Sequence, residues 1–119
     1  ECKSCAEKLK AAVGHLTQVT GALVGIAVKG EIDRFLADAT LFLEFSGIIC
    51  IAWQWLLQGM AAAKALAGGA EADRDFLEGK LLVMKFFYEY ELPKIEGLRA
   101  RLMSGEAVTT AAEPRHFTD

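Results

Sequence analysis

The stretch Lys80–Leu98, KLLVMKFFYEYELPKIEGL, carries the strongest folding signal in the chain. Four of the five residues from Phe86 to Tyr90 are aromatic, and Pro93 follows inside an otherwise helical pattern. At 100° per residue, the apolar residues in and around this stretch fall within about 60° of one line along a helix. They are Leu77, Leu81, Met84, Tyr88, Leu92, Ile95, Leu98 and Leu102. The pattern predicts a helix over residues 73–104 with one core face, kinked at Pro93 because proline lacks the backbone N–H.

A second apolar line runs along the same helix, about 110° from the first. It consists of Phe76, Val83, Phe87 and Tyr90, and polar residues occupy the side opposite both lines. A three-helix bundle uses only one of these two faces, and an exposed apolar strip is a liability unless something covers it. We therefore predict that these four residues form an interface.

The N-terminal segment shows an amphipathic pattern that predicts a helix over residues 4–29, ended by Gly30. Two apolar lines recur every seven residues: Cys2, Leu9, Leu16 and Leu23, and Cys5, Ala12, Val19 and Ile26. Within this helix, Gly21 and Gly25 form a G-x-x-x-G pattern. We expect this pattern to let a neighbouring helix approach closely.

Residues 31–67 contain no proline and predict one long helix, although Ser46-Gly47 leaves its continuity open. Its main apolar stripe joins three heptad lines: Ile32, Ala39, Ser46, Trp53 and Met60; Phe35, Phe42, Ile49, Leu56 and Ala63; and Leu36, Leu43, Cys50 and Leu57. The middle of the helix is apolar nearly all round, because Phe45, Ile51 and Trp55, among others, lie off that stripe. Such a helix is covered from more than one side, so Trp55 is a fifth interface candidate.

These patterns predict an all-α fold, an up-down antiparallel bundle of three long helices at about 4–29, 31–67 and 73–104. Dimerisation would complete the bundle by covering the second apolar face. Residues 1–105 would form the helical domain, and residues 106–119, which show no periodicity, a flexible C-terminal tail.

Composition and charge narrow the possible binding partners and the cellular compartment of the protein. The 119 residues carry a net charge of −3, which gives no electrostatic footprint for nucleic acid. The apolar run in residues 41–57 makes a poor membrane span, because Glu44 and Gln54 lie within it. Three cysteines suit the reducing cytoplasm rather than a disulfide framework. We expect a cytoplasmic protein that binds neither nucleic acid nor membranes.

The sequence offers no catalytic, cofactor-binding or metal-binding set. Cys2 and Cys5 have C-x-x-C spacing, but a zinc site needs about four ligands and both cysteines continue the core lines of the first helix. Glycines form no phosphate-binding loop after a strand. Three charged residues border the apolar stripes, Glu44, Lys80 and Glu91, and we interpret them as rim groups. The pattern is typical of a helical interaction module without an active site.

Two segments resemble the C-terminal helical domain of the larger acyl-CoA dehydrogenases, the group that includes 3-methylmercaptopropionyl-CoA dehydrogenase-like enzymes. They are ADATLFLEFSGIICIAWQWLLQGMAAAKALAGG and DRDFLEGKLLVMKFFYEYELPKIEGLRARLMSG. The resemblance covers roughly residues 31–105 and rests on the order of an apolar helix with tryptophans, a glycine turn, the Gly79-Lys80 pair, the aromatic cluster and Leu92-Pro93.

The resemblance implies a non-catalytic C-terminal domain that packs on a dehydrogenase body, on the subunit interface, or on both. The parent enzyme would bind FAD and oxidise an acyl-CoA substrate in fatty acid metabolism as a homodimer, and this fragment alone would have no activity. A free-standing helical dimerisation or adaptor module is one alternative, which the upstream reading frame would distinguish. A membrane hairpin is the other, and it would require detergent for extraction.

Overall fold

The computed structural model describes residues 1–118, and each regular element in that range is helical. The predicted all-α class is therefore confirmed. The elements are α1 (Cys2–Val28), α2 (Ile32–Leu36), α3 (Ala39–Ala67), α4 (Arg74–Phe86), a π-helical turn (Phe87–Glu91), a 3-10 turn (Leu92–Lys94), α5 (Ile95–Met103), α6 (Val108–Ala111) and a 3-10 turn (Pro114–His116). Asp119, the last residue of the predicted tail, lies outside the described residues.

The long helices begin and end close to the predicted positions. Gly30 and Gly69 follow α1 and α3 with φ angles of +82° and +84°, a conformation that favours glycine. The prediction of one helix over residues 31–67 is wrong at its start, because a turn at Ala37-Asp38 separates α2 from α3. Arg101 of α5 holds this turn by donating a hydrogen bond to the Asp38 carboxylate at 3.1 Å. The chain passes Ser46-Gly47 without interruption.

Pro93 interrupts the regular helix at the predicted place. The backbone N–H of Leu92 donates to the carbonyl of Phe87, five residues earlier, which is the π-helical pattern. A wider turn accommodates the proline, whose ring would clash with the carbonyl four residues before it in a regular α-helix. The segment from α4 to α5 is therefore helical throughout but changes its hydrogen-bond spacing between Phe87 and Lys94.

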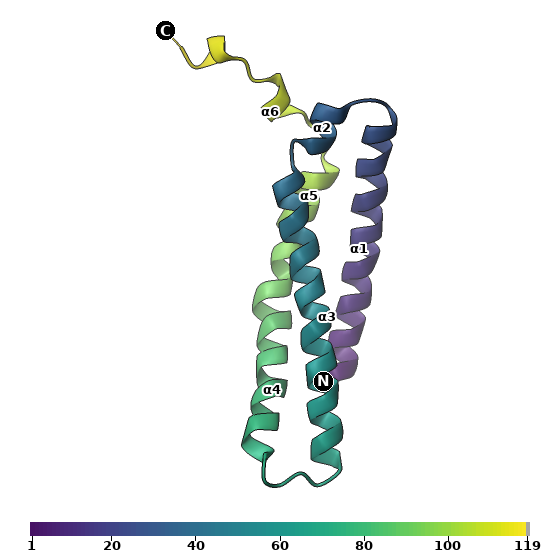
Figure 1. Cartoon of the computed structure of the whole chain (residues 1–119), viewed down its shortest axis with the longest axis vertical. Helices are drawn as coiled ribbons and strands as arrows, with labels where there is room; N and C mark the ends of the chain where they lie inside the picture. Colours follow the sequence, from purple (N-terminus) through teal and green to yellow (C-terminus); the bar gives the residue numbers. More distant parts are fainter. Residues whose placement is uncertain (119) are drawn as a thin grey trace.

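Contacts along the chain give the directions of the three long segments (Figure 1). Lys85 binds Glu1 and Glu89 binds Lys8, so α1 and the α4–α5 segment run in the same direction. Lys80 binds Gln58 and Arg101 binds Asp38, so α3 runs opposite to the α4–α5 segment. The backbone is flat and elongated, with extents of 67 × 33 × 16 Å.

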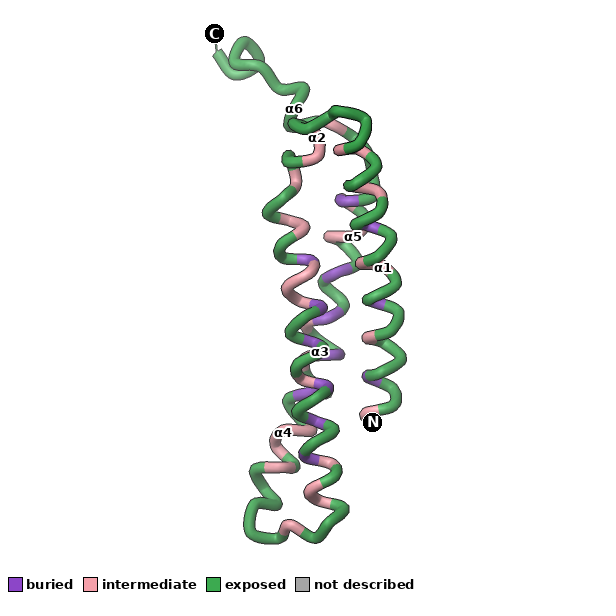
Figure 2. The backbone as a smooth tube through the Cα atoms, turned by 45° about the vertical axis from the view of Figure 1, so that its right-hand side comes forward, coloured by how far each residue is buried: buried purple, intermediate pink, exposed green. Residues whose placement is uncertain are grey.

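The molecule has a three-helix section and a two-helix section (Figures 1 and 2). Glu1 pairs with Lys85, so α1 begins at the level of the last turn of α4. Beyond that level only the end of α3 and the first turns of α4 lie side by side (Figure 1). Residues 106–118, which include α6, extend away from the opposite end (Figure 2).

The core follows one heptad seam of α3, which we call the inner seam. It consists of Phe45, Ile49, Ala52, Leu56 and Gly59. Buried residues of the other helices pack on it: Cys5, Ala12, Val19, Met84, Tyr88, Leu92, Ile95 and Leu102. The predicted core faces of the first and third helices are thus confirmed, although Leu77, Leu81 and Leu98 are only partly buried.

The main stripe predicted for the second helix is wrong in its orientation. Phe45 and Ala52, which lie off that stripe, are fully buried, whereas Trp53 and Met60, which lie on it, are about half exposed. The heptad line through Ile49 and Leu56 is the part of the predicted stripe that also belongs to the inner seam. The pattern misled because α3 is apolar on nearly every side, so periodicity alone did not select the core face.

The expected close approach at Gly21 and Gly25 is also absent. A Cβ atom built on either glycine would meet nothing within 4 Å. The tight contact is at Gly59 instead, where a Cβ would collide with the Sδ of Met84. Gly59 therefore lets α3 and α4 approach each other in the core.

Candidate interaction surface

The structure divides the five predicted interface residues into two groups. Phe76, Val83 and Tyr90 are exposed, as an interface in a separate chain requires. Phe87 and Trp55 are partly buried and pack against the core. Phe87 therefore lies at the edge of the bundle rather than on the free surface.

Lys80 brings two of the predicted residues together in the two-helix section. Its Nζ atom lies 5.4 Å from the ring centroids of both Trp55 and Phe76. The same atom donates a hydrogen bond to Oε1 of Gln58 at 2.8 Å. Ring faces attract cations, so this lysine joins α3 to α4 while its aliphatic stem covers apolar surface. We call Trp55, Gln58, Phe76 and Lys80 the lysine cluster.

Tyr90 belongs to a different surface, which we call the aromatic strip. It consists of Leu82, Phe86 and Tyr90, whose exposed fractions are 68%, 51% and 67%. The rings of Phe86 and Tyr90 stack with centroids 4.7 Å apart and an interplanar angle of 19°. Sequence reasoning missed Leu82 and Phe86, although Leu82, Phe86 and Tyr90 follow one another at intervals of four residues, which is a helical signal.

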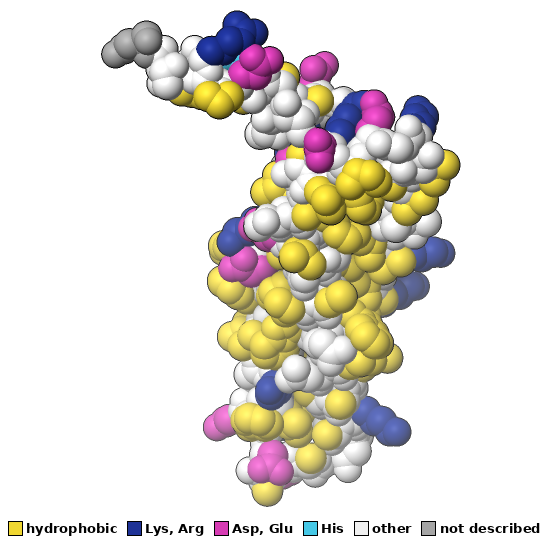
Figure 3. Space-filling view, turned by 45° about the horizontal axis from the view of Figure 1, so that its top comes forward, with side chains coloured by type: hydrophobic (Ala, Val, Ile, Leu, Met, Phe, Trp, Pro, Cys, Tyr) yellow, Lys and Arg dark blue, Asp and Glu magenta, His cyan; other side chains and the backbone are white. Residues whose placement is uncertain are grey.

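A third apolar surface follows the exposed side of α3. Its residues are Ala39, Leu43, Ser46, Cys50, Trp53, Leu57 and Met60, and all except the partly buried Ser46 are exposed. At its N-terminal end, this surface joins a groove of about 340 Å³ between α1, α2 and α3. The groove is lined by Thr20, Leu23, Val24, Phe35, Leu36, Ala39, Phe42 and Leu43. Figure 3 shows hydrophobic side chains along the length of this face, with charged groups mainly at its edges.

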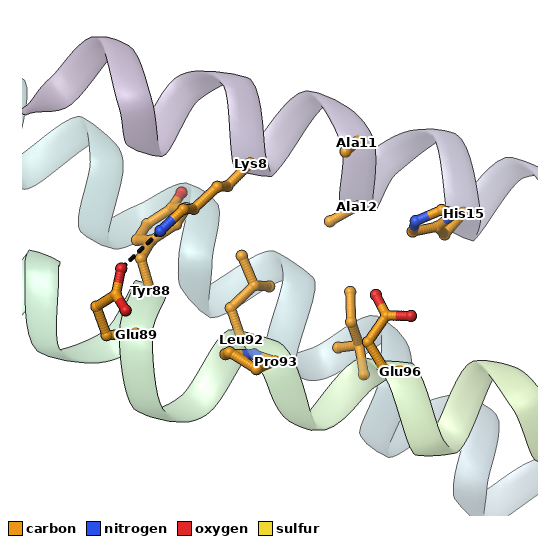
Figure 4. A pocket seen from close by; sticks show the side chains of 10 residues that line it. Lys8, Ala11, Ala12, His15, Tyr88, Glu89, Leu92, Pro93 and Glu96 are labelled. Atoms are coloured by element: carbon orange, nitrogen blue, oxygen red, sulfur yellow. Dashed lines mark hydrogen bonds and ion pairs between the residues drawn. The ribbon is translucent and has the colours of Figure 1, made fainter.

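A cleft of about 280 Å³ lies between α1 and the irregular turns around Pro93 (Figure 4). Lys8 and His15 approach it from α1, and Glu89 and Glu96 approach it from the other side (Figure 4). Lys8 binds Glu89 at 2.7 Å, and this pairing lowers the pKa of the Glu89 carboxyl and raises that of Lys8. These pKa shifts come from an exposed ion pair at the rim of the cleft. They do not come from an acid and a base that are buried away from water.

The buried polar groups near this cleft are already occupied in the core. The Tyr88 hydroxyl donates a hydrogen bond to the Ala52 carbonyl at 2.8 Å, and burial raises the pKa of the phenol to about 12. Burial likewise raises the pKa of the Cys5 thiol, which makes it a poor nucleophile or metal ligand. Among residues 1–118, no group of three or more His, Cys, Asp or Glu side chains could hold a metal ion.

Two helices are long and apolar enough to cross a membrane, by length and composition only. They are α1 and α3. In the most apolar stretch of 18 residues, 11% of the residues are buried in α1 and 22% in α3. The core helix of a soluble protein passes the same test, so this finding alone gives no direction to the function.

A family model described as acetyl-CoA dehydrogenase C-terminal like matches residues 1–113, which include α1 through α6. No curated protein and no solved structure matches the chain.

Proposed function

The chain belongs to the acetyl-CoA dehydrogenase C-terminal-like family, and from this premise we propose that it is the non-catalytic C-terminal domain of an FAD-dependent acyl-CoA dehydrogenase. In this proposal the three long segments act as an up-down bundle with a docking face for the dehydrogenase body. FAD and the acyl-CoA substrate bind to the body, and the helical domain supplies a supporting surface.

The observation that carries this proposal is the aromatic strip. Leu82 and Phe86 lie on α4 and Tyr90 lies in the π-helical turn that follows it, and this segment packs into the core through Met84 and Tyr88. Burying two aromatic side chains and a leucine contributes about 1.5–3 kcal/mol each before the costs of association. When both partners belong to one chain, the translational part of that cost falls, so a strip of this size is enough for stable docking.

The lysine cluster supports the same assignment. Phe76 is 65% exposed and lies next to Lys80, which is itself partly buried. The cluster and the strip both include residues of α4, so a single body that covers the exposed sides of α4 reaches both. A docking surface of this kind gives the two-helix section the cover that α1 provides for the three-helix section.

The test uses the complete reading frame that contains this chain. We expect its product to include a dehydrogenase body, to carry FAD and to oxidise an acyl-CoA. The double variant Phe86→Glu, Tyr90→Glu should free the domain from the body, because two charges at a docking surface cannot be buried without partners. Limited proteolysis should then release an intact helical domain at least tenfold faster than from the unaltered protein.

Lys10→Glu is the matched control, because Lys10 is exposed on α1 and its side chain makes no hydrogen bond or ion pair in the described residues. This variant introduces the same side chain away from α4 and should leave the cleavage rate unchanged. An equal cleavage rate in the double variant would contradict the docking role of the strip. A reading frame that begins shortly before Glu1 and encodes no body would instead favour the free-standing adaptor.

A further inference from the structure

The exposed side of α3 carries a second heptad seam, which we call the outer seam. Its positions are Ala39, Leu43, Ser46, Cys50, Trp53, Leu57 and Met60, so the spacing alternates strictly between four and three residues. The inner seam, which packs in the core, has the same alternation from Phe45 to Gly59. Each seam is thus a continuous line along one helix, and only the inner seam is covered by this chain.

The spacing of the outer seam permits another helix as its occupant. Apolar residues at alternating intervals of four and three form a line along which the side chains of a second helix can interlock. The chemistry of the seam then indicates which helix fits it. From Ala39 to Met60 the outer seam spans about 32 Å, long enough for side chains to interlock over three heptads.

The chemistry of the outer seam fits a copy of itself. Between residues 45 and 63, α3 has no charged side chain, so a second α3 brings no like charges into the middle of the contact. In two of the three pairings a large residue also meets a small one. With a two-fold axis between Ile51 and Ala52, antiparallel pairing sets Leu43 against the partner's Met60, Ser46 against the partner's Leu57, and Cys50 against the partner's Trp53.

We propose that the outer seam of α3 binds the outer seam of a second copy of this chain, antiparallel, about a two-fold axis near the middle of the helix. Such a contact is isologous, so each residue pair occurs twice and the surface covers itself. The groove beside Leu43 extends this contact toward α1 and α2. This interface does not depend on the aromatic strip, which remains free for the dehydrogenase body.

Sedimentation of the chain against concentration tests the interface. We expect a dimer, and we expect Trp53→Glu and Leu57→Glu each to raise the dissociation constant at least 100-fold. Both positions are about half exposed, so these variants should keep their helical content by circular dichroism. The matched control is Lys10→Glu, which places the same side chain on an exposed residue of α1 outside the seam and should leave the dissociation constant unchanged.

Cross-linking tests the antiparallel geometry without altering the large residues of the seam. Cys50 is exposed and lies near the proposed axis, so a short bis-maleimide reagent should join two copies through it in a Cys2→Ser, Cys5→Ala background. The matched control moves the thiol away from the axis by combining Cys50→Ser with Ala39→Cys. In an antiparallel pair the two new thiols lie about 38 Å apart along the helices and should not be joined.

Four results would overturn the proposal. They are a monomer at all concentrations, a dimer that Phe86→Glu abolishes and Trp53→Glu does not, efficient cross-linking through Ala39→Cys, and a monomer that binds vesicles of phosphatidylcholine and phosphatidylglycerol in a Trp53-dependent way. The third result indicates a parallel pair, and the fourth indicates that the seam faces lipid.

Discussion

The two seams of α3 have the same residue spacing and differ in burial. The inner seam, from Phe45 to Gly59, is at most 7% exposed among its apolar members from Phe45 to Leu56. The outer seam has the same alternating spacing and carries Leu43, Trp53, Leu57 and Met60 at 45–69% exposure. A heptad pattern therefore predicts that a helix will pack against it, but does not say whether that helix belongs to the same chain.

The difference in burial arises from the residues of the other helices that contact each seam. The inner seam meets Met84 and Tyr88 of the α4–α5 segment and Cys5, Ala12 and Val19 of α1. No element of the described chain covers the outer seam, because α1 lies beside α3 rather than over it (Figure 1). Stability should respond to changes in the inner seam, and assembly should respond to changes in the outer one.

The largest expected effect is a loss of stability from the inner seam alone. Phe45→Ala should lower the free energy of unfolding by about 3–5 kcal/mol, because a fully buried ring is replaced by a cavity. Leu43→Ala, two residues away on the outer seam, should change it by less than about 0.5 kcal/mol when the chain is monomeric. Urea denaturation at low protein concentration measures both.

Equal losses of unfolding free energy in Phe45→Ala and Leu43→Ala would contradict this distinction between the seams, because both seams would then stabilise the monomer. At high protein concentration Leu43→Ala should cost more than it does in the monomer, because the dimer contact adds to the measured stability.

The sequence predicted the positions of the helices better than it predicted which face of each helix is buried. The core lines of α1 and of the α4–α5 segment were predictable because polar residues such as Lys8, Glu78 and Glu89 mark their outer sides. The middle of α3 lacks such markers, so its core face depends on the positions of Met84 and Tyr88, which no local pattern of α3 contains. The turn at Ala37-Asp38 was missed for a similar reason, because the Arg101 side chain that holds it comes from α5.

The candidate surface was partly predictable. Phe76, Val83 and Tyr90 were identified because helical spacing set them away from the core line, and they are exposed. Phe87 and Trp55 are partly buried and pack against the core, and the exposed Phe86 was not among the predicted residues. The π-helical turn between Phe87 and Glu91 changes the angle per residue, so positions assigned at 100° drift along this stretch.

A smaller loss of stability is expected from a change at Gly59, where the inner seam packs closely against α4. Gly59→Ala should lower the free energy of unfolding by about 1–3 kcal/mol, because the new Cβ would meet the buried Met84 side chain. The greater helix propensity of alanine offsets about 1 kcal/mol of that cost. Gly47→Ala is the matched control next to the outer seam, where a Cβ meets nothing within 4 Å.

Gly47→Ala should therefore stabilise the monomer by about 0.5–1 kcal/mol, since only the propensity difference remains. Thermal melting of both variants at one low protein concentration gives the comparison. Stabilisation by Gly59→Ala would show that α3 and α4 have room to separate at this point.

The smallest effect concerns the hydrogen bond from Tyr88 to the inner seam. Tyr88→Phe removes the bond to the Ala52 carbonyl and should cost about 1 kcal/mol near neutral pH. Burial raises the pKa of Tyr88 to about 12 in the folded chain, whereas an unfolded tyrosine titrates near 10. The neutral phenol is thus the form that folding favours, so its contribution is complete below pH 10 and is lost as the pH rises from about 10 to about 12.

The unfolding free energies of the unaltered chain and Tyr88→Phe should therefore converge as the pH rises above about 10, and Tyr88→Phe should become the more stable protein as the pH approaches 12, because the shift in pKa corresponds to more than the roughly 1 kcal/mol of the hydrogen bond. Cys5 also titrates at high pH, since burial raises its pKa, but both proteins contain it and their difference isolates Tyr88. Tyr90→Phe, on the exposed aromatic strip, is the control and should follow the unaltered chain at every pH. A constant difference between Tyr88→Phe and the unaltered chain across this range would mean that the Tyr88 hydroxyl reaches water, and that the inner seam is open to solvent beside Ala52.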